Sequence, residues 1–249
     1  MTLVIAHISD LHLDLGVRAQ QRAVLVIGYL ASLTDEIDAV LVTGDIADHG
    51  LAAEYSQARD LLVAFRVPVL VLPGNHDERA HWRAAFTESP HSTEPINTSA
   101  RVGDAVFALC DSTIPGRDDG YLHDSTLTWL DELLDEADAS ALAAFVCFHH
   151  PPVTLHMPYL DSIRQAGADR LEALIRRHPS VVAVLCGHAH TPAASQFAGL
   201  PLLVAPGVAS TVALSWESAE LLDLDAPPGV AFHILDDDKR LITHFRVPT

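Results

Sequence analysis

The hydrophobic positions of the chain form short runs that alternate with longer amphipathic segments. The runs are rich in Val, Ile and Leu, and each is typical of a strand buried on both faces. They lie at residues 3–8, 38–43, 67–72, 104–110, 142–148 and 181–186. Apolar residues with helical spacing fill the intervals, at residues 17–33, 51–65, 78–86, 124–137 and 161–178. This alternation predicts an α/β protein with largely parallel strands.

Local signals support the boundaries of two helices. Asp124 and Asp161 are predicted to be helix N-caps, because a carboxylate can accept hydrogen bonds from the free N–H groups of a first turn. Pro179 is predicted to end the segment after His178, because proline cannot continue a helix.

The C-terminal part of the chain has a different pattern, which predicts a meander or a second sheet. Its strand-like runs are short and lie at residues 201–205, 208–215, 230–235 and 241–246. Two polar loops, 87–99 and 115–120, are expected to be mobile, and neither is long enough to link two domains. We therefore predict one domain over residues 1–249.

Composition and charge exclude one class of partner. The chain is 49% hydrophobic, enough for a full core, and carries a net charge of −18 with only 15 Lys and Arg residues. Affinity for nucleic acid comes largely from cations that neutralise phosphates, so we expect no nucleic-acid polymer as a partner. A small anionic substrate stays compatible with this charge if the site itself supplies positive charge.

The N-terminal apolar run, residues 3–8, is too short for a secretory signal or a membrane span. We therefore expect a cytoplasmic protein without a membrane partner. Cys110, Cys147 and Cys186 each end an apolar run, which favours buried thiols over disulfides.

Side chains that can bind metals follow five of the predicted strands. They are Asp10 and His12, Asp45, Asn75 with His76 and Asp77, His149 and His150, and His188 and His190. Taken singly, each has an ordinary structural explanation as a cap, a turn residue or a hydrogen-bonded histidine. In parallel α/β folds, however, the carboxyl ends of the strands build a common site. No Lys accompanies these groups, so together they would be poorly paired without a bound cation.

The donor types limit the metal. Nitrogen and oxygen ligands without cysteine suit Mn, Fe, Zn or Co better than a structural thiolate site or an all-oxygen calcium site. Seven candidate ligands are more than one ion needs, whereas two ions that share a carboxylate would use them all.

The motifs also carry a resemblance. The strings HISDLHL, VTGDIADHG, LPGNHDE, FHHPP and VLCGHAHTP occur in this order and resemble the calcineurin-like metallophosphoesterase superfamily. Within it, they are similar to the class III cyclic-nucleotide phosphodiesterases and the related glycerophosphodiesterases. The resemblance covers roughly residues 3–210. It implies a four-layer α/β/β/α sandwich of two mixed sheets flanked by helices, with a dimetal site at one edge.

The resemblance also implies roles for individual residues. Asp10, His12 and His190 would bind the first metal ion and Asn75, His149 and His188 the second, with Asp45 bridging both. His76 would be the catalytic residue near the substrate phosphate, as a proton donor to the leaving group or as an electrostatic stabiliser. Asn75, His76 and His156 are the candidates for substrate binding. Tyr159 and Asp161, in the same loop as His156, could also line the pocket, because loops after strand ends often do.

The implied function is hydrolysis of small phosphodiesters by direct attack of a metal-activated hydroxide. The first choice of substrate is a 3′,5′-cyclic nucleotide such as cyclic AMP, and glycerophosphodiesters are the alternative. A phosphomonoesterase or nucleotide hydrolase, and a non-catalytic metal-binding scaffold, are further alternatives. The expected cofactors are two divalent ions, Mn²⁺ or Fe, with Zn²⁺ or Co²⁺ as options. Members of this type often dimerise, so a homodimer or higher homo-oligomer is a further expectation.

Overall fold

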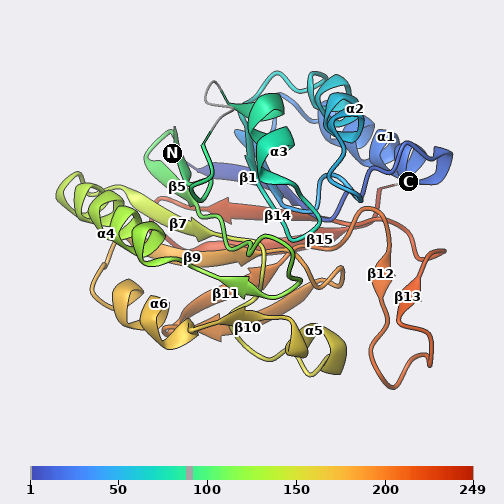
Figure 1. Ribbon diagram of the computed structural model, residues 1–249. Helices are drawn as coiled ribbons and strands as arrows, with labels where there is room; N and C mark the ends of the chain where they lie inside the picture. The colour runs from blue at the N-terminus through green and yellow to red at the C-terminus, as the bar shows by residue number, and fades with distance from the viewer. Residues whose placement is uncertain (1, 88–91, 249) are drawn as a thin grey trace.

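Two β-sheets stack face to face in the computed structural model, which describes residues 2–87 and 92–248 (Figure 1). The first sheet has the strand order β15-β14-β1-β2-β3. Strands β1, β2 and β3 are parallel, and β14 and β15 add to β1 as an antiparallel pair. The strands are β1 (Leu3–Ile8), β2 (Ala39–Thr43), β3 (Val69–Leu72), β14 (Val230–Leu235) and β15 (Leu241–Arg246).

The second sheet has the order β10-β11-β9-β7-β5-β4. Its four central strands are parallel, and the outer strands β10 and β4 are antiparallel to their neighbours. The strands are β4 (Thr98–Val102), β5 (Ala105–Leu109), β7 (Ala143–Cys147), β9 (Val181–Cys186), β10 (Ala193–Phe197) and β11 (Leu200–Val204).

Helices cover the outer faces of both sheets. Helices α1 (Val17–Ala31), α2 (Ala52–Leu62) and α3 (Arg79–Phe86) lie on the first sheet, and α4 (Asp124–Ala139) and α6 (Ala168–Ile175) lie on the second (Figure 1). A short helix α5 and two small strand pairs complete the fold. They are α5 (Pro158–Ser162), β6 (Gly120–Tyr121) with β8 (Gln165–Ala166), and β12 (Thr211–Val212) with β13 (Leu222–Asp223).

Alternation along the strands separates the core into layers. On β1, Ile5 faces the second sheet, whereas Ala6 and Ile8 face the helices. Between the sheets, Phe107 and Phe145 stack with ring centroids 4.7 Å apart. Because strands buried on both faces need apolar residues at every position, the continuous runs in the sequence follow directly from this architecture. The predicted four-layer α/β/β/α fold is confirmed; the single domain stays a prediction.

The predicted helix over 161–178 is wrong. The chain forms α5, then the strand β8, and only then α6, because Gly167 adopts a left-handed conformation with φ of 63° at the start of α6. Asp161 is not an N-cap either. It lies inside α5, where its carboxylate accepts hydrogen bonds from the N–H groups of Leu155 (2.7 Å) and Met157 (3.1 Å).

Other boundaries also differ from the prediction. Asp124 is the first residue of α4 and His123 is its N-cap, and α6 ends at Ile175, ahead of Pro179. Strands β4 and β10 were not predicted from the sequence. Both are edge strands with partly exposed residues, so neither contains a continuous hydrophobic run.

The two polar loops have different surroundings. Within the loop 87–99, residues 88–91 lie outside the described part of the chain. The N–H of Ile96 donates to the buried carboxylate of Asp111 at 2.8 Å, which ties the end of this loop to the second sheet. In the loop 115–120, Arg117 pairs with Asp119. The mobility expected of both loops stays a prediction.

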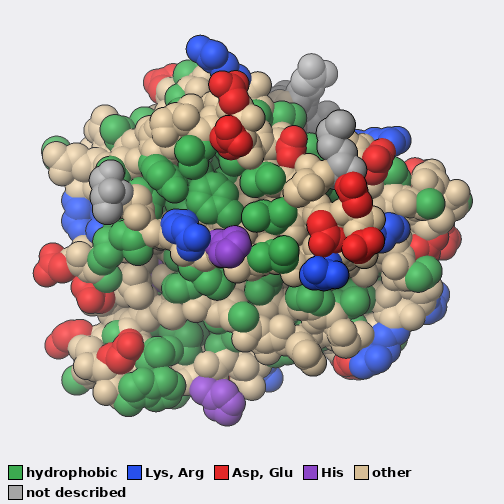
Figure 2. All heavy atoms as spheres, turned by 180° about the vertical axis from the view of Figure 1, so that it is seen from behind, with side chains coloured by type: hydrophobic (Ala, Val, Ile, Leu, Met, Phe, Trp, Pro, Cys, Tyr) green, Lys and Arg blue, Asp and Glu red, His purple; other side chains and the backbone are tan. Residues whose placement is uncertain are grey.

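Three further features bear on the sequence predictions. The three cysteines are free and buried, as expected. Within the described ranges, no helix has the length and apolar character needed to cross a bilayer. Figure 2 shows Lys and Arg side chains together with Asp and Glu side chains on one face of the molecule. The expectation that nucleic acid is not a partner stays a prediction.

His178 joins α6 to α4 through two carboxylates. Its Nδ1 lies 2.8 Å from Asp138 and its Nε2 lies 2.7 Å from Asp131. Burial lowers the pKa of His178, but the hydrogen bonds to Asp131 and Asp138 outweigh it and raise the pKa above its ordinary value. The stabilisation is therefore complete below the unfolded pKa of about 6.5 and is lost as pH rises through the higher folded value.

We predict that His178→Gln lowers the free energy of unfolding by about 1–3 kcal/mol near pH 6, because it removes charge-assisted hydrogen bonds. The loss is expected to be smaller at an alkaline pH above the raised folded pKa, where the wild-type histidine has lost its charge. Urea unfolding at both pH values measures it, with the exposed His123→Gln as the control. An equal loss at both pH values would contradict the charged state of His178.

Candidate active site

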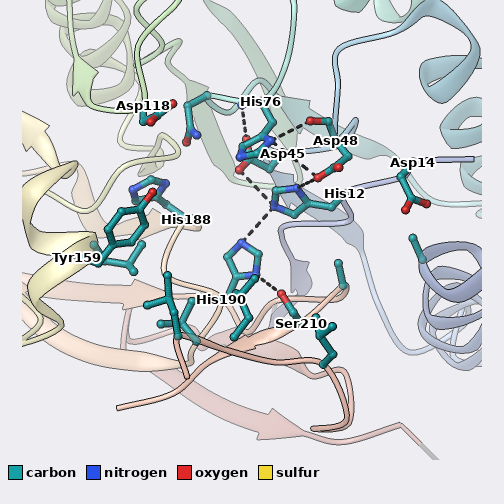
Figure 3. Close-up of a pocket in the computed structure, with 18 of the residues that line it drawn as sticks. His12, Asp14, Asp45, Asp48, His76, Asp118, Tyr159, His188, His190 and Ser210 are labelled. Carbon is teal, nitrogen blue, oxygen red and sulfur yellow. Dashed lines mark hydrogen bonds and ion pairs between the residues drawn. The ribbon is translucent and has the colours of Figure 1, made fainter. Parts of the chain in front are cut away.

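The polar groups that follow the strands meet in one cleft at the carboxyl ends of both sheets. The cleft has a volume of about 450 Å³, and its lining includes His12, Asp45, Asn75, His188 and His190 (Figure 3). These side chains come from β1, β2 and β3 of the first sheet and from β9 of the second. The convergence that the strand-end pattern predicted is therefore present.

A first cluster contains Asp10, His12, Asp45 and His190. Their candidate ligand atoms all lie within 4.8 Å of one another. The Nε2 atoms of His12 and His190 face each other at 3.1 Å, and His190 Nε2 lies 3.6 Å from Asp10 Oδ1. Figure 3 shows His12, Asp45 and His190 pointing toward the same point.

Hydrogen bonds on the outer side of the rings orient this cluster. His12 Nδ1 lies 2.8 Å from Asp48 Oδ1, and His190 Nδ1 lies 2.9 Å from the hydroxyl of Ser210. When Nδ1 carries the proton, Nε2 presents its lone pair to the centre of the cluster. In metal sites, histidine ligands are commonly oriented in this way by a hydrogen bond from the other ring nitrogen. Asp48 and Ser210 were missed from the sequence. Asp48 stands three residues after Asp45, whereas Ser210 has no sequence signal near His190.

A second cluster contains Asn75, His149 and His188. His149 Nε2 lies 3.1 Å from Asn75 Oδ1 and 3.2 Å from His188 Nδ1. The fully buried His149 donates from Nδ1 to the carbonyl of Thr43 at 2.6 Å, so its Nε2 presents a lone pair when the ring is neutral.

The neighbouring His150 is hydrogen-bonded to groups outside the second cluster. Its Nδ1 lies 2.8 Å from the hydroxyl of Ser112, and its Nε2 lies 3.1 Å from the carbonyl of Asp118. His150 nevertheless stays beside the second cluster, because its ring centroid lies 4.9 Å from that of His149 and 4.6 Å from that of His188. Candidate ligand atoms of these three histidines lie within 4.8 Å of one another.

Asp45 connects the two clusters. Its Oδ2 lies 3.4 Å from His12 Nε2 and 3.4 Å from His149 Nε2. Its Oδ1 accepts a hydrogen bond from the N–H of His76 at 2.9 Å. One carboxylate oxygen therefore stands equally far from a histidine of each cluster, in the position that a ligand shared by two ions requires.

The electrostatics of the cleft favour a cation. Burial lowers the pKa of His149, but the charge and hydrogen bond of Asp45 outweigh it and raise the pKa to about 9. Burial raises the pKa of Asp45, yet the nearby His149 holds it well below its ordinary value. For His188, burial and the charges of His150 and His149 keep the pKa well below its ordinary value. The negative charge of Asp45 that attracts a proton would equally attract a metal ion.

The donor set fits two metal ions. Among the described residues, Asp10 Oδ2 and His188 Nε2 are buried side-chain atoms without a hydrogen-bond partner. In both clusters, imidazole nitrogens also lie 3.1–3.6 Å from one another or from oxygen acceptors. Buried acceptors without donors are costly, and a cation in each cluster would satisfy them.

Backbone strain marks the same positions. Five of the seven candidate ligands have positive φ angles, which cost free energy in residues other than glycine. They are Asp10 (57°), His12 (39°), Asp45 (49°), His188 (70°) and His190 (54°). A cluster of such residues is characteristic of functional sites held in shape by the surrounding fold.

Two glycines permit the close approach of the ligand loops. A Cβ atom on Gly187 would lie 1.9 Å from Ser9 Oγ, and one on Gly74 would lie 2.2 Å from Asp45 Oδ1. Both contacts are closer than van der Waals packing allows. Gly187, before His188, is therefore required by the approach of the two sheets, and Gly74, before Asn75, by the approach of two neighbouring ligand loops of the first sheet.

The remaining predicted residues are also placed. His76 lines the cleft, and its Nδ1 donates to the carbonyl of Asp48 at 2.8 Å, which leaves Nε2 for a substrate. Asp77 accepts hydrogen bonds from the N–H groups of Ile46, Ala47 and Gly74, so it holds two ligand loops together.

Of the three residues expected to line the pocket beyond His150, which are His156, Tyr159 and Asp161, only Tyr159 lines the cleft. His156 is exposed and is not among the residues that line the cleft, whereas Tyr159 is. The short helix α5, which the sequence did not predict with these bounds, places Tyr159 there.

The fold and the paired clusters define a metallophosphoesterase. The family model described as "Calcineurin-like phosphoesterase" matches residues 3–192, and the chain belongs to this family.

Curated relatives cover nearly the whole chain. A glycerophosphodiester phosphodiesterase GpdQ from Enterobacter lignolyticus is 32% identical over 93% of this chain and 86% of the relative. A 3′,5′-cyclic adenosine monophosphate phosphodiesterase CpdA from Pseudomonas aeruginosa is 31% identical over 97% of this chain and 89% of the relative. A solved dimetal phosphatase from Danio rerio is 15% identical and has a TM-score of 0.74, covering 99% of this chain and 96% of that one. It supports the fold alone.

We predict that Gly187→Ala lowers the free energy of unfolding by about 1–3 kcal/mol, because the added methyl group overpacks the contact with Ser9 and Thr43. It should also weaken metal binding by displacing His188. Gly28→Ala, where a Cβ meets nothing within 4 Å on helix α1, is the matched control and should raise stability by about 1 kcal/mol. Urea unfolding and metal analysis measure both variants, and a stable Gly187→Ala protein with full metal content would contradict the close approach.

Proposed function

We propose that the cleft is the active site of a dinuclear metal-dependent phosphodiesterase that hydrolyses small phosphodiesters. Membership of the calcineurin-like phosphoesterase family and relatives named as phosphodiesterases establish a metal-dependent phosphoric diester hydrolase. The dinuclear assignment rests on the position of Asp45. Its Oδ2 atom lies 3.4 Å from His12 Nε2 and 3.4 Å from His149 Nε2.

In this proposal, Asp10, His12 and His190 hold one ion and Asn75, His149 and His188 hold the other, with Asp45 shared. When bound, two divalent ions polarise the phosphoryl oxygens and acidify a water for in-line attack on phosphorus. Two carboxylates offset only part of the charge of two divalent ions. The site then keeps local positive charge and attracts a phosphodiester despite the acidic chain.

His76 is proposed to assist departure of the leaving group. The hydrogen bond from Nδ1 to the carbonyl of Asp48 fixes the ring, so Nε2 can meet a substrate oxygen as a proton donor or as an electrostatic stabiliser. The N–H of His76 also donates to Asp45, which couples the position of this histidine to the shared ligand.

The physiological diester is the finer part of the proposal. The names of the relatives include both cyclic-nucleotide and glycerophosphodiester phosphodiesterases, and we propose a 3′,5′-cyclic nucleotide as the first choice. Nitrogen and oxygen ligands favour Mn²⁺ or Fe, with Zn²⁺ or Co²⁺ as alternatives. The cytoplasmic location and the homo-oligomer stay predictions.

The function is tested by comparing a bis-aryl phosphate with its aryl monoester on protein reconstituted with Mn²⁺. A diesterase is expected to have the higher kcat/KM on the bis-aryl phosphate. A higher kcat/KM on the monoester would instead support the phosphomonoesterase alternative. Absence of turnover on both, in protein with full metal content, would support a metal-binding scaffold.

We predict that Asp45→Asn lowers the bound metal from about two ions per chain to less than one and lowers kcat/KM by at least about 100-fold. The reason is that both ions lose the same negative ligand. Elemental analysis after dialysis measures the metal. Asp60→Asn, at an exposed position of α2, is the control and should change neither quantity. Two retained ions with normal turnover in Asp45→Asn would refute the shared ligand.

We predict that His76→Ala lowers kcat by about 100-fold while the metal content stays unchanged, because His76 acts on the substrate and is not assigned as a ligand. His123→Ala, at an exposed histidine, is the control. Loss of either ion from His76→Ala would show that His76 supports metal binding, against the proposed role.

A further inference from the structure

The cleft continues beyond the candidate metal ligands over an apolar surface with two walls. One wall is α5, and the other is the hairpin formed by β12 and β13, at the same end of the molecule (Figure 1). The walls present Tyr159, Leu160 and Ile163 on one side and Leu221, Leu222 and Leu224 on the other. The volume of about 450 Å³ for the whole cleft is typical of a small-molecule site.

The hairpin is attached to the same segments that carry the candidate ligands. The N–H of Ala209, just before the hairpin, donates to the carbonyl of Asp10 at 2.9 Å. The hydroxyl of Thr191, next to His190, donates to the carbonyl of Val212 in β12. These bonds set the position of the apolar wall relative to the metal site.

Two arginines of α1 hold the remaining ends of the hairpin. The guanidinium of Arg18 donates to the carbonyl of Leu224. That of Arg22 donates to the carbonyls of Val208 (2.7 Å) and Ala226 (2.6 Å). Hydrogen bonds to its backbone carbonyls and the buried Val212 therefore hold the hairpin in place, while Leu221, Leu222 and Leu224 stay exposed.

The apolar side chains on both walls stay accessible. Tyr159 is 52% exposed and Leu222 is 47% exposed. Apolar surface that is held open beside a site of polar chemistry is characteristic of ligand-binding surfaces. Figure 3 places Tyr159 on the same side of the cleft as His188.

The lining also contains the carboxylates of Asp14 and Asp118, but several other polar groups beside the two apolar walls are already engaged. Ser210 contacts His190, Asp48 contacts His12, and Arg18 donates to the hairpin backbone. The apolar walls themselves offer one side-chain hydroxyl, that of Tyr159. A polyhydroxyl group such as glycerol would find few partners here, whereas a flat aromatic group would bury surface against the leucines and stack on the tyrosine ring.

We propose that Tyr159, Ile163, Leu221, Leu222 and Leu224 form an apolar subsite that receives a flat aromatic group of the substrate, such as a nucleobase. This inference rests on the proposed function and deepens it, because it makes the subsite the element that favours nucleotide diesters over aliphatic ones. Tyr159 and Leu222 are the specificity-determining residues on the two walls.

The first test is equilibrium binding, which does not depend on turnover. Calorimetry on Mn²⁺-reconstituted protein compares AMP with ribose 5-phosphate, which lacks the base. Wild-type protein is expected to bind AMP more tightly. Tyr159→Ala is expected to weaken AMP binding about tenfold and Leu222→Ala about threefold, with ribose 5-phosphate unchanged. Tyr159→Phe, which keeps the ring, is expected to bind AMP as the wild type does.

The second test is kinetic. Tyr159→Ala is expected to raise KM for cyclic AMP about tenfold with kcat nearly unchanged, and to leave KM for glycerophosphocholine as it is. Trp216→Ala is the matched control, because Trp216 is an aromatic residue of the same hairpin that is 72% exposed and does not line the cleft. Metal content is measured in every variant.

Three outcomes would overturn the inference. Wild-type protein could bind AMP no more tightly than ribose 5-phosphate, Tyr159→Ala could shift both substrates equally, or Trp216→Ala could match Tyr159→Ala. Each of these leaves the proposed function intact if the wild type still hydrolyses diesters. If the metal-loaded wild type hydrolysed neither diester, the proposed function would be refuted. The inferred subsite, which rests on that function, would then be refuted as well.

Discussion

The geometry of the cleft depends on one constraint: histidine, aspartate and asparagine ligand atoms converge there without a Lys or Arg side chain among them. Imidazole nitrogens and carboxylate oxygens approach one another at 3.1–3.6 Å, and two buried ligand atoms have no partner within the described chain. Such an arrangement is unfavourable unless cations occupy it. The strained backbone of the ligand loops and the glycines before His188 and Asn75 have the same origin, because they bring these ligand atoms together.

Residues around the two clusters fix the orientation of the ligand side chains and of the loops that carry them. Thr43, Asp48 and Ser210 each contact the outer nitrogen of a histidine and turn the other nitrogen inward. Asp77 binds three backbone N–H groups and keeps two ligand loops in register. The hairpin beside His190 adds the apolar wall. In the proposed function, phosphate chemistry and recognition of an organic group would therefore be carried by neighbouring but separate elements.

The sequence predicted the central strands because their positions are buried on both faces and therefore uniformly apolar, as in β1 and β9. It did not predict the edge strands β4 and β10, whose residues are partly exposed and lack a hydrophobic run. The segment 161–178 has helical spacing, yet Gly167 and the pairing of β8 with β6 divide it. Local periodicity cannot detect a pairing with a strand more than 40 residues away.

The sequence by itself determined the α/β class, the seven candidate ligands and their place at strand ends, because hydrophobic periodicity and residue type are local properties. The resemblance of its motifs added the family and the assignment of the ligands to two ions. Only the tertiary structure decided that Asp45 lies between the two clusters, that Asp48 and Ser210 orient the histidines, and that Tyr159 faces the cleft in place of His156. These facts depend on how two sheets approach each other in space, and residues as distant in the sequence as Asp10 and His188 become neighbours only when both sheets have folded.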